Sequence, residues 1–96
     1  MILSPKAFRF VSDAVSRLTD QRFGRAWSEA RPETPLTDAQ VEAALHALDR
    51  EIKRTRAEVE RLSSDDAVSD LKNDLMYLML IDRNLRDRTM PAELAR

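Results

Sequence analysis

The chain has 96 residues, of which 43% are hydrophobic and 34% charged, with a formal net charge of −1 and no cysteine. A chain of this length folds as one small domain, and one glycine beside four prolines argues against a β fold rich in tight turns. The lack of cysteine excludes a disulfide framework, a thiolate zinc site and a cysteine nucleophile. We therefore expect a single domain of the all-α class over residues 1–96.

The sequence contains no segment typical of export or membrane insertion. Its start, Met-Ile-Leu-Ser-Pro-Lys, lacks the basic stretch followed by a long apolar one that marks a signal peptide. No run approaches the roughly 20 apolar residues that a membrane-spanning helix needs. We expect a soluble, cytoplasmic protein without membrane contact.

A first helix is predicted over residues 5–22. Ser4, followed by proline, fits an N-cap and a first helical position, where the missing proline N–H would be unpaired in any case. Gly24 is placed to end the helix through a left-handed cap, and a short helical turn carrying Trp27 is expected over residues 25–31. The helix has an apolar stripe at steps of three and four residues, made of Phe8, Val11, Val15 and Leu18.

A linker over residues 32–36 separates two parts of one domain, because its two prolines disfavour helix. Thr37 and Gln40 follow it at the spacing of a capping box, in which each side chain accepts the backbone N–H of the other residue. This signal predicts a second helix over residues 38–62.

The second helix and a third one, predicted over residues 65–88, carry matching heptad patterns. Ser63 and Ser64 interrupt the pattern and indicate a short turn, and residues 89–96 are expected to form a tail. A long antiparallel helical hairpin, similar to a coiled coil, would bring the two apolar seams together. The seams consist of Val41, Leu45, Leu48, Ile52, Thr55, Val59 and Leu62 on one helix and Val68, Leu71, Leu75, Leu78, Asp82 and Leu85 on the other.

The run from Leu75 to Ile81 makes the third helix apolar on more than its seam, and such a helix needs more than one neighbour. We expect the stripe of the first helix to cover this surplus and complete a three-helix core, with Phe23 and Trp27 closing one end. Alternatively, a second copy covers part of it in a dimer that forms a larger bundle, and the first helix packs in cis or in trans. The apolar residues off the seam are Met76, Met79, Leu80 and Ile81.

His46 and Asp82 are the polar residues on or beside the seams. His46 has no companion at a metal-binding spacing, so we expect a surface histidine. Residues whose numbers sum to about 130 would face each other in the hairpin, which makes a contact between His46 and Asp82 a hypothesis. A carboxylate at a core position is costly unless paired, so we expect Asp82 to pair with Arg83, Arg86 or His46 and help fix the register. The functional alternative is an acidic anchor for a basic side chain of a partner.

No motif in the sequence names a reaction, a ligand or a partner. Without a nucleophile and base, a phosphate-binding loop or metal-ligand spacing, we expect no enzymatic activity, no cofactor and no metal site. The predicted function is protein–protein interaction through a helical face, in an adaptor that also self-associates as a homodimer. The candidate partner-binding residues are Phe10, Trp27, Tyr77, Met79, Leu80, Ile81 and Asp82.

The alternative is a nucleic-acid-associated regulator that uses the basic N-terminal helix. Residues 1–31 carry six Lys or Arg against three Asp or Glu, whereas the rest of the chain carries ten against fourteen. Basic side chains of this kind contact phosphates, although neither helix-turn-helix spacing nor a glycine-rich loop accompanies them. The candidate residues are Arg9, Arg17, Arg22 and Arg25.

Overall fold

The computed structural model describes residues 2–62 and 65–87. Within these residues it contains four helices and no strand, which confirms the all-α prediction for this part of the chain. The turn expected at residues 63–64 and the tail expected over residues 89–96 lie outside the described residues. The helices are α1 (Pro5–Ser16), α2 (Gln21–Ser28), α3 (Asp38–Arg61) and α4 (Asp65–Arg86).

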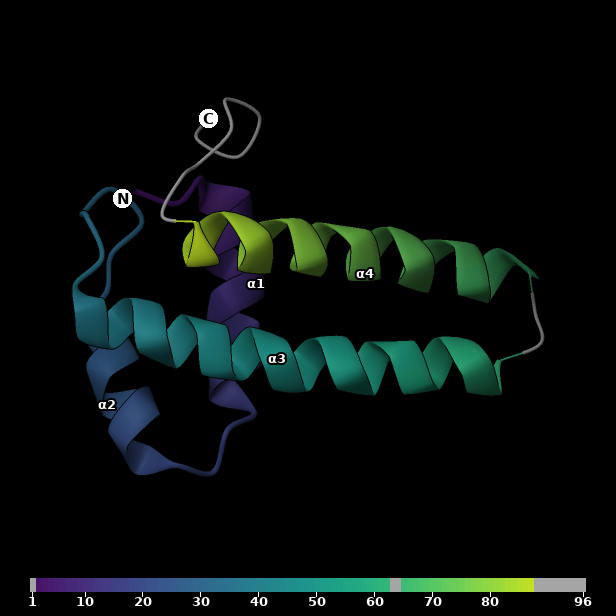
Figure 1. Cartoon of the computed structure of the whole chain (residues 1–96), viewed down its shortest axis with the longest axis horizontal. Helices are drawn as coiled ribbons and strands as arrows, with labels where there is room; N and C mark the ends of the chain where they lie inside the picture. Colours follow the sequence, from purple (N-terminus) through teal and green to yellow (C-terminus); the bar gives the residue numbers. More distant parts are fainter. Residues whose placement is uncertain (1, 63–64, 88–96) are drawn as a thin grey trace.

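The helices are arranged in two layers (Figure 1). Helices α3 and α4 run side by side in opposite directions, and α1 crosses behind them. Helix α2 packs on the N-terminal part of α3, on the side away from α4. Because α1 crosses the N-terminal half of α3 and the C-terminal half of α4, the other halves of the pair extend beyond it. The heptad register of a coiled coil stays a prediction.

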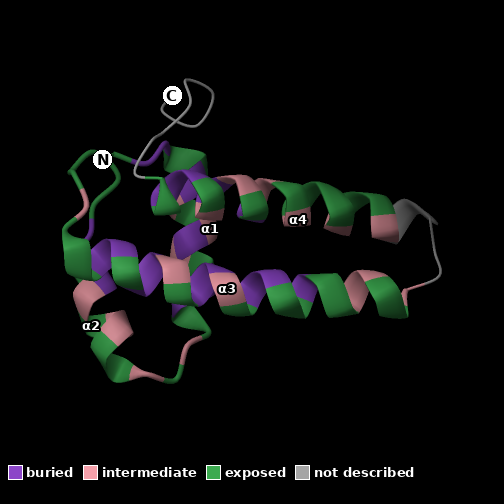
Figure 2. Cartoon of the chain, viewed as in Figure 1, coloured by how far each residue is buried: buried purple, intermediate pink, exposed green. Residues whose placement is uncertain are grey.

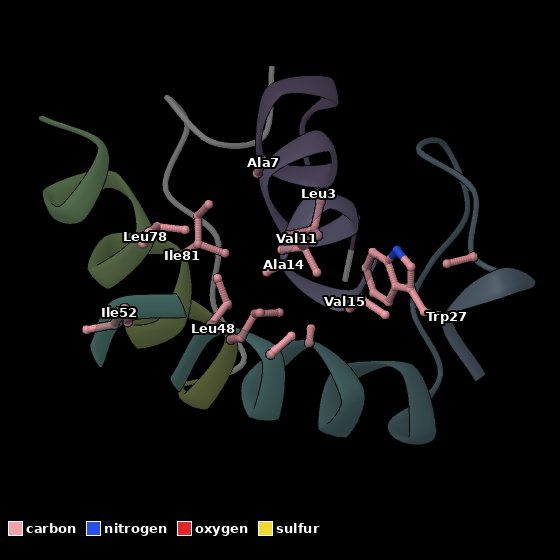
Figure 3. Packing of buried hydrophobic residues seen from close by; sticks show 14 residues of the cluster. Leu3, Ala7, Val11, Ala14, Val15, Trp27, Leu48, Ile52, Leu78 and Ile81 are labelled. Atoms are coloured by element: carbon pink, nitrogen blue, oxygen red, sulfur yellow. The ribbon is translucent and has the colours of Figure 1, made fainter. Parts of the chain in front are cut away.

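The core lies where α1 crosses the other two long helices. Val11 of α1, Leu48 of α3 and Ile81 of α4 are each 0% exposed and belong to one cluster, which Figure 3 shows from close by. In Figure 2 the buried residues gather at this crossing. Farther along the pair, seam residues such as Val59 and Leu71 are only half-buried. The crossing therefore supplies most of the apolar burial that stabilises the fold.

The N-terminal helix ends earlier than the sequence predicted. Helix α1 stops at Ser16, with Arg17 as its C-cap, and a separate helix α2 begins after Asp20. The prediction of one helix over residues 5–22 is therefore wrong, as is the role of Gly24 as a cap, because Gly24 lies inside α2. A local cap accompanies the break, since the Asp20 carboxylate accepts the Arg22 N–H at 2.9 Å and starts a new helix.

The Asp20 carboxylate is also bound by the Arg22 side chain. Hydrogen bonds from the Arg22 guanidinium and its backbone N–H lower the pKa of Asp20 below its usual value. A carboxylate with a lowered pKa stabilises the fold above its unfolded-state pKa, and this contribution is lost as the pH falls through the lowered value. Acid therefore weakens the start of α2.

The break between α1 and α2 lets Trp27 return to the core. Its ring stacks on Phe8 of α1, with 5.2 Å between ring centroids, and its indole N–H donates to the Ser12 hydroxyl at 3.0 Å. Trp27 is 6% exposed as a result. A continuous helix over these residues would carry Trp27 along the axis of α1 and away from Phe8.

The start of α3 agrees with the sequence. The Thr37 hydroxyl accepts the Gln40 N–H at 3.2 Å, and the Gln40 side-chain oxygen accepts the Thr37 N–H at 3.0 Å, which confirms the capping box. The Gln40 amide also donates to the Ala26 carbonyl at 3.3 Å. The cap therefore joins α3 to α2 besides starting the helix.

The position of Gly24 inside α2 generates a stability prediction. A Cβ at this position would meet no atom within 4 Å, and its backbone is not left-handed. Gly24→Ala should therefore raise the free energy of unfolding by about 0.5–1 kcal/mol, because alanine loses less conformational freedom in a helix. Urea denaturation measures the change, with Ala26→Gly in the same helix as the control expected to lower stability. A loss of stability in Gly24→Ala would instead support a left-handed cap.

Candidate functional site

The candidate site is a groove of about 570 Å³ between α3 and α4. No residue of α1 or α2 lines it, so it opens on the face of the α3–α4 layer that α1 leaves free. We call it the methionine groove. Its lining residues are Asp49, Ile52, Lys53 and Arg56 of α3 and Met76, Met79, Leu80, Asp82 and Arg83 of α4.

The groove exists because α4 has two apolar stripes. One stripe, formed by Leu78, Ile81 and Leu85, is buried against α1 and α3. The other begins with Met76 and Met79, and these residues lie one helical turn apart. The two stripes lie on different sides of α4, and a single crossing helix cannot cover both. Helix α1 therefore buries one stripe and leaves the other exposed.

The methionines of the second stripe are exposed. Met76 is 69% and Met79 43% exposed, and the only other large hydrophobic residue so exposed among the described residues is Ile2 at 44%. Leu80 beside them is half-buried, whereas Ile81 is fully buried. The expectation that the first helix covers the whole surplus is therefore wrong for the methionines and holds for Ile81.

The charges around the groove are unevenly paired. Lys53 binds Asp49 at 3.1 Å, and the guanidinium of Arg86 donates to Oδ2 of Asp82 at 2.9 Å, which raises the pKa of Arg86. Arg56 forms no such ion pair among the described residues. Its guanidinium lies instead 3.8 Å from the Met79 sulfur. A thioether is a weak acceptor, so Arg56 keeps most of its hydrogen-bonding capacity.

Asp82 is incompletely satisfied. Its side chain is 18% exposed, and its Oδ1 atom is buried without a hydrogen-bond partner, the only such side-chain atom among the described residues. A buried acceptor left unpaired costs about 1–3 kcal/mol. The predicted pairing of Asp82 with Arg86 is confirmed, but that bond satisfies only one of the two carboxylate oxygens.

His46 does not pair with Asp82. Its ring stacks on Phe23 of α2, with 4.6 Å between ring centroids and 25° between ring planes. The hypothesis of a contact between His46 and Asp82 is therefore wrong, because α2 packs on the side of α3 that carries His46. As expected, His46 is exposed at the surface.

The other predicted partner-binding residues are divided between the core and a second surface. Trp27 and Ile81 are buried, which removes both from the candidate anchors. Phe10 and Tyr77 form an edge-to-face pair with 4.9 Å between ring centroids, and the Lys6 ammonium lies 4.5 Å from the Tyr77 centroid. This aromatic pair joins α1 to α4 and does not line the methionine groove.

The arginines proposed for nucleic acid lie on two separate surfaces. Arg22 and Arg25 belong to α2, where Arg22 is held by Asp20. Arg9 of α1 and Arg17, the C-cap of α1, line instead a groove that Glu51 also lines, and Arg17 approaches the buried Glu51 carboxylate to 3.4 Å. Two arginines of α3 that the sequence analysis missed, Arg50 and Arg54, complete this second group, and Arg54 also binds Glu51.

The chain offers few other indications of chemistry. Among residues 2–62 and 65–87, no three His, Asp or Glu side chains come together as a metal site would require. No described helix combines the length and the apolar character needed to cross a membrane. The cytoplasmic location expected from the sequence stays a prediction.

Comparison with known protein families, with curated proteins and with solved structures found no match. The methionine groove is therefore the feature of the chain that points to a function.

The unpaired oxygen of Asp82 generates a prediction for the single chain. Asp82→Leu should raise the free energy of unfolding by about 1 kcal/mol, because it removes a buried unsatisfied acceptor and loses only a partly exposed ion pair. Chemical denaturation at low protein concentration measures the change. Asp49→Leu is the matched control, since Asp49 lines the same groove but is paired and 48% exposed, and it should change stability little. Destabilisation by Asp82→Leu would contradict the prediction.

Proposed function

We propose that this chain is a non-enzymatic protein–protein interaction protein, an adaptor that binds through the methionine groove and self-associates. The single observation that carries the proposal is the exposure of Met76 and Met79 in a groove between two long helices. In this proposal α3 and α4 act as a coiled-coil-like hairpin that presents the groove to a helical partner.

The chemistry of the groove suits such a role. Methionine side chains are flexible and polarisable, so they pack against apolar surfaces of varied shape. Apolar surface removed from water contributes about 25 cal/mol per Å² to association. The charged residues along the edges, including Lys53 and Arg83, orient a partner rather than supply most of the affinity.

A charge placed in the groove tests this proposal. Met79→Glu should weaken self-association by tenfold or more, because binding would bury an unpaired carboxylate. Light scattering on a sizing column, over a wide range of protein concentration, gives the mass of each species. The fold itself should persist, since Met79 is 43% exposed in the single chain.

Ile2→Glu is the matched control. Ile2 is 44% exposed, nearly as much as Met79, but does not line the groove, so this variant should associate like the wild type. Equal loss of association in both variants would point to a general effect of charge. Unchanged association in Met79→Glu would reject the groove as the binding surface.

A second candidate function follows from the arginines around Glu51. Arg9, Arg17, Arg50 and Arg54 line two neighbouring grooves together with Asp13, Glu51 and Asp74, which leaves an excess of one positive charge for a phosphate backbone. Arg9 and Arg50 have no ion-pair partner among the described residues, so they are the side chains most available for such contacts.

The salt dependence of nucleic-acid binding tests this alternative. If the chain binds a fluorescent single-stranded oligonucleotide, affinity should fall steeply with salt, and Arg9→Ala with Arg50→Ala should reduce the slope by about 1 for each arginine removed. Arg22→Ala with Arg25→Ala is the control on the other surface and should leave the slope unchanged. Binding that does not respond to salt would reject the alternative.

A further inference from the structure

We infer that the occupant of the methionine groove is an amphipathic helix of another protein, whose apolar stripe is flanked by aspartate or glutamate. This inference rests on the proposed function and specifies the chemistry of the partner. It follows from the charges that line the groove and from two arginines that lack a carboxylate partner among the described residues.

Both carboxylates that line the groove already bind a cation of the chain. Asp49 is bound by Lys53 of the same helix at 3.1 Å. Asp82 is bound through Oδ2 by Arg86, and its Oδ1 atom is closed to solvent within the chain. A basic partner would therefore have to compete with Lys53 and Arg86 for these carboxylates.

Two arginines of the groove are in the opposite situation. Arg56 of α3 and Arg83 of α4 are exposed, and neither forms an ion pair within residues 2–62 and 65–87. Arg56 lies beside Met79, with its guanidinium 3.8 Å from the sulfur, and a thioether is a weak acceptor. Arg83 follows Met79 by one turn on the same face of α4. Positive charge without a counter-ion therefore borders the exposed methionines.

The dimensions of the groove fit a helix. Its walls are two antiparallel helices, and on α3 its lining extends from Asp49 to Arg56, a rise of about 10 Å at about 1.5 Å per residue. About two turns of a partner helix laid along the groove would place apolar side chains, three or four residues apart, over Met76 and Met79. A carboxylate beside that stripe would face Arg56, and one a turn farther along would lie near Arg83.

A second copy of the chain suits these charges less well. A two-fold contact through the groove would bring the unpaired arginines of both copies to one interface, and like charges placed together oppose association. Carboxylates of an acidic helix would instead pair with arginines that are exposed, so the pairs cost little desolvation. We therefore expect an acidic helix to bind more tightly than a second copy and to displace it from the groove.

A matched pair of synthetic peptides tests the inference. Each peptide is about 18 residues long, which allows a helix to form, and carries leucines three and four residues apart along one stripe. The residues flanking the stripe are glutamate in one peptide and lysine in the other. The wild-type chain should bind the glutamate peptide at least about tenfold more tightly than the lysine peptide, and added salt should reduce this preference. Fluorescence anisotropy of the labelled peptides gives both dissociation constants.

Charge reversal in the groove should invert the preference. In Arg56→Glu with Arg83→Glu, the lysine peptide should bind at least about tenfold more tightly than the glutamate peptide. Circular dichroism checks the fold, and if this variant does not fold, Arg56→Gln with Arg83→Gln should abolish the preference. Arg25→Glu with Lys72→Glu is the matched control. It changes the net charge equally at exposed residues that do not line the groove, so it should keep the wild-type preference.

The remaining outcomes separate this inference from the proposed function. If both peptides bind equally and Met76→Ser with Met79→Ser weakens both, the groove binds helices but the acidic partner is overturned. An unchanged preference in the charge-reversed variant would overturn it as well. If neither peptide binds while Met79→Glu still weakens self-association, a second copy is the occupant and the acidic helix is overturned. If changes of the methionines affect neither peptide binding nor self-association, the proposed function fails too.

Discussion

The structure depends on one constraint, which is that α4 is apolar on two sides and that a single helix of the described residues crosses it. Helix α1 buries the stripe with Ile81 at its centre, and alanines at the crossing, such as Ala7 and Ala44, let the helices approach closely. The stripe with Met76 and Met79 remains in solvent. Within residues 2–62 and 65–87 no further element covers it, and an exposed apolar patch of this kind is either an interface or a liability.

The sequence predicted those parts of the fold that depend on local contacts. Thr37 and Gln40 cap α3 by bonds within one turn, so residue types alone locate the start of that helix. The break after Ser16 was missed because its main consequence is distant. Trp27 packs on Phe8 across 19 positions of sequence, and neither the Asp20 cap nor the apolar period near it reveals that contact.

In the candidate site too, contacts within one helix were predicted from the sequence and contacts between helices were not. The Asp82–Arg86 pair spans one helical turn and was among the expected pairings. The stack of His46 on Phe23 and the group of arginines around Glu51 join different helices, so their formation depends on how the helices pack. A heptad pattern gives the apolar faces of a helix but not which of them a third helix will cover.

The exposure of the methionines is the strongest reason to propose that the groove binds a partner. Exposed methionines and a buried, unpaired carboxylate oxygen each reduce the stability or solubility of a single chain, and within the described residues they occur together in one groove. A leucine in place of Asp82 would extend the seam without an unpaired acceptor. A partner surface on the groove would cover the methionines, whereas Oδ1 of Asp82 is already closed to solvent within the chain and stays unpaired. The specificity of an association through the groove would come from the charged residues along its edges rather than from the apolar methionines.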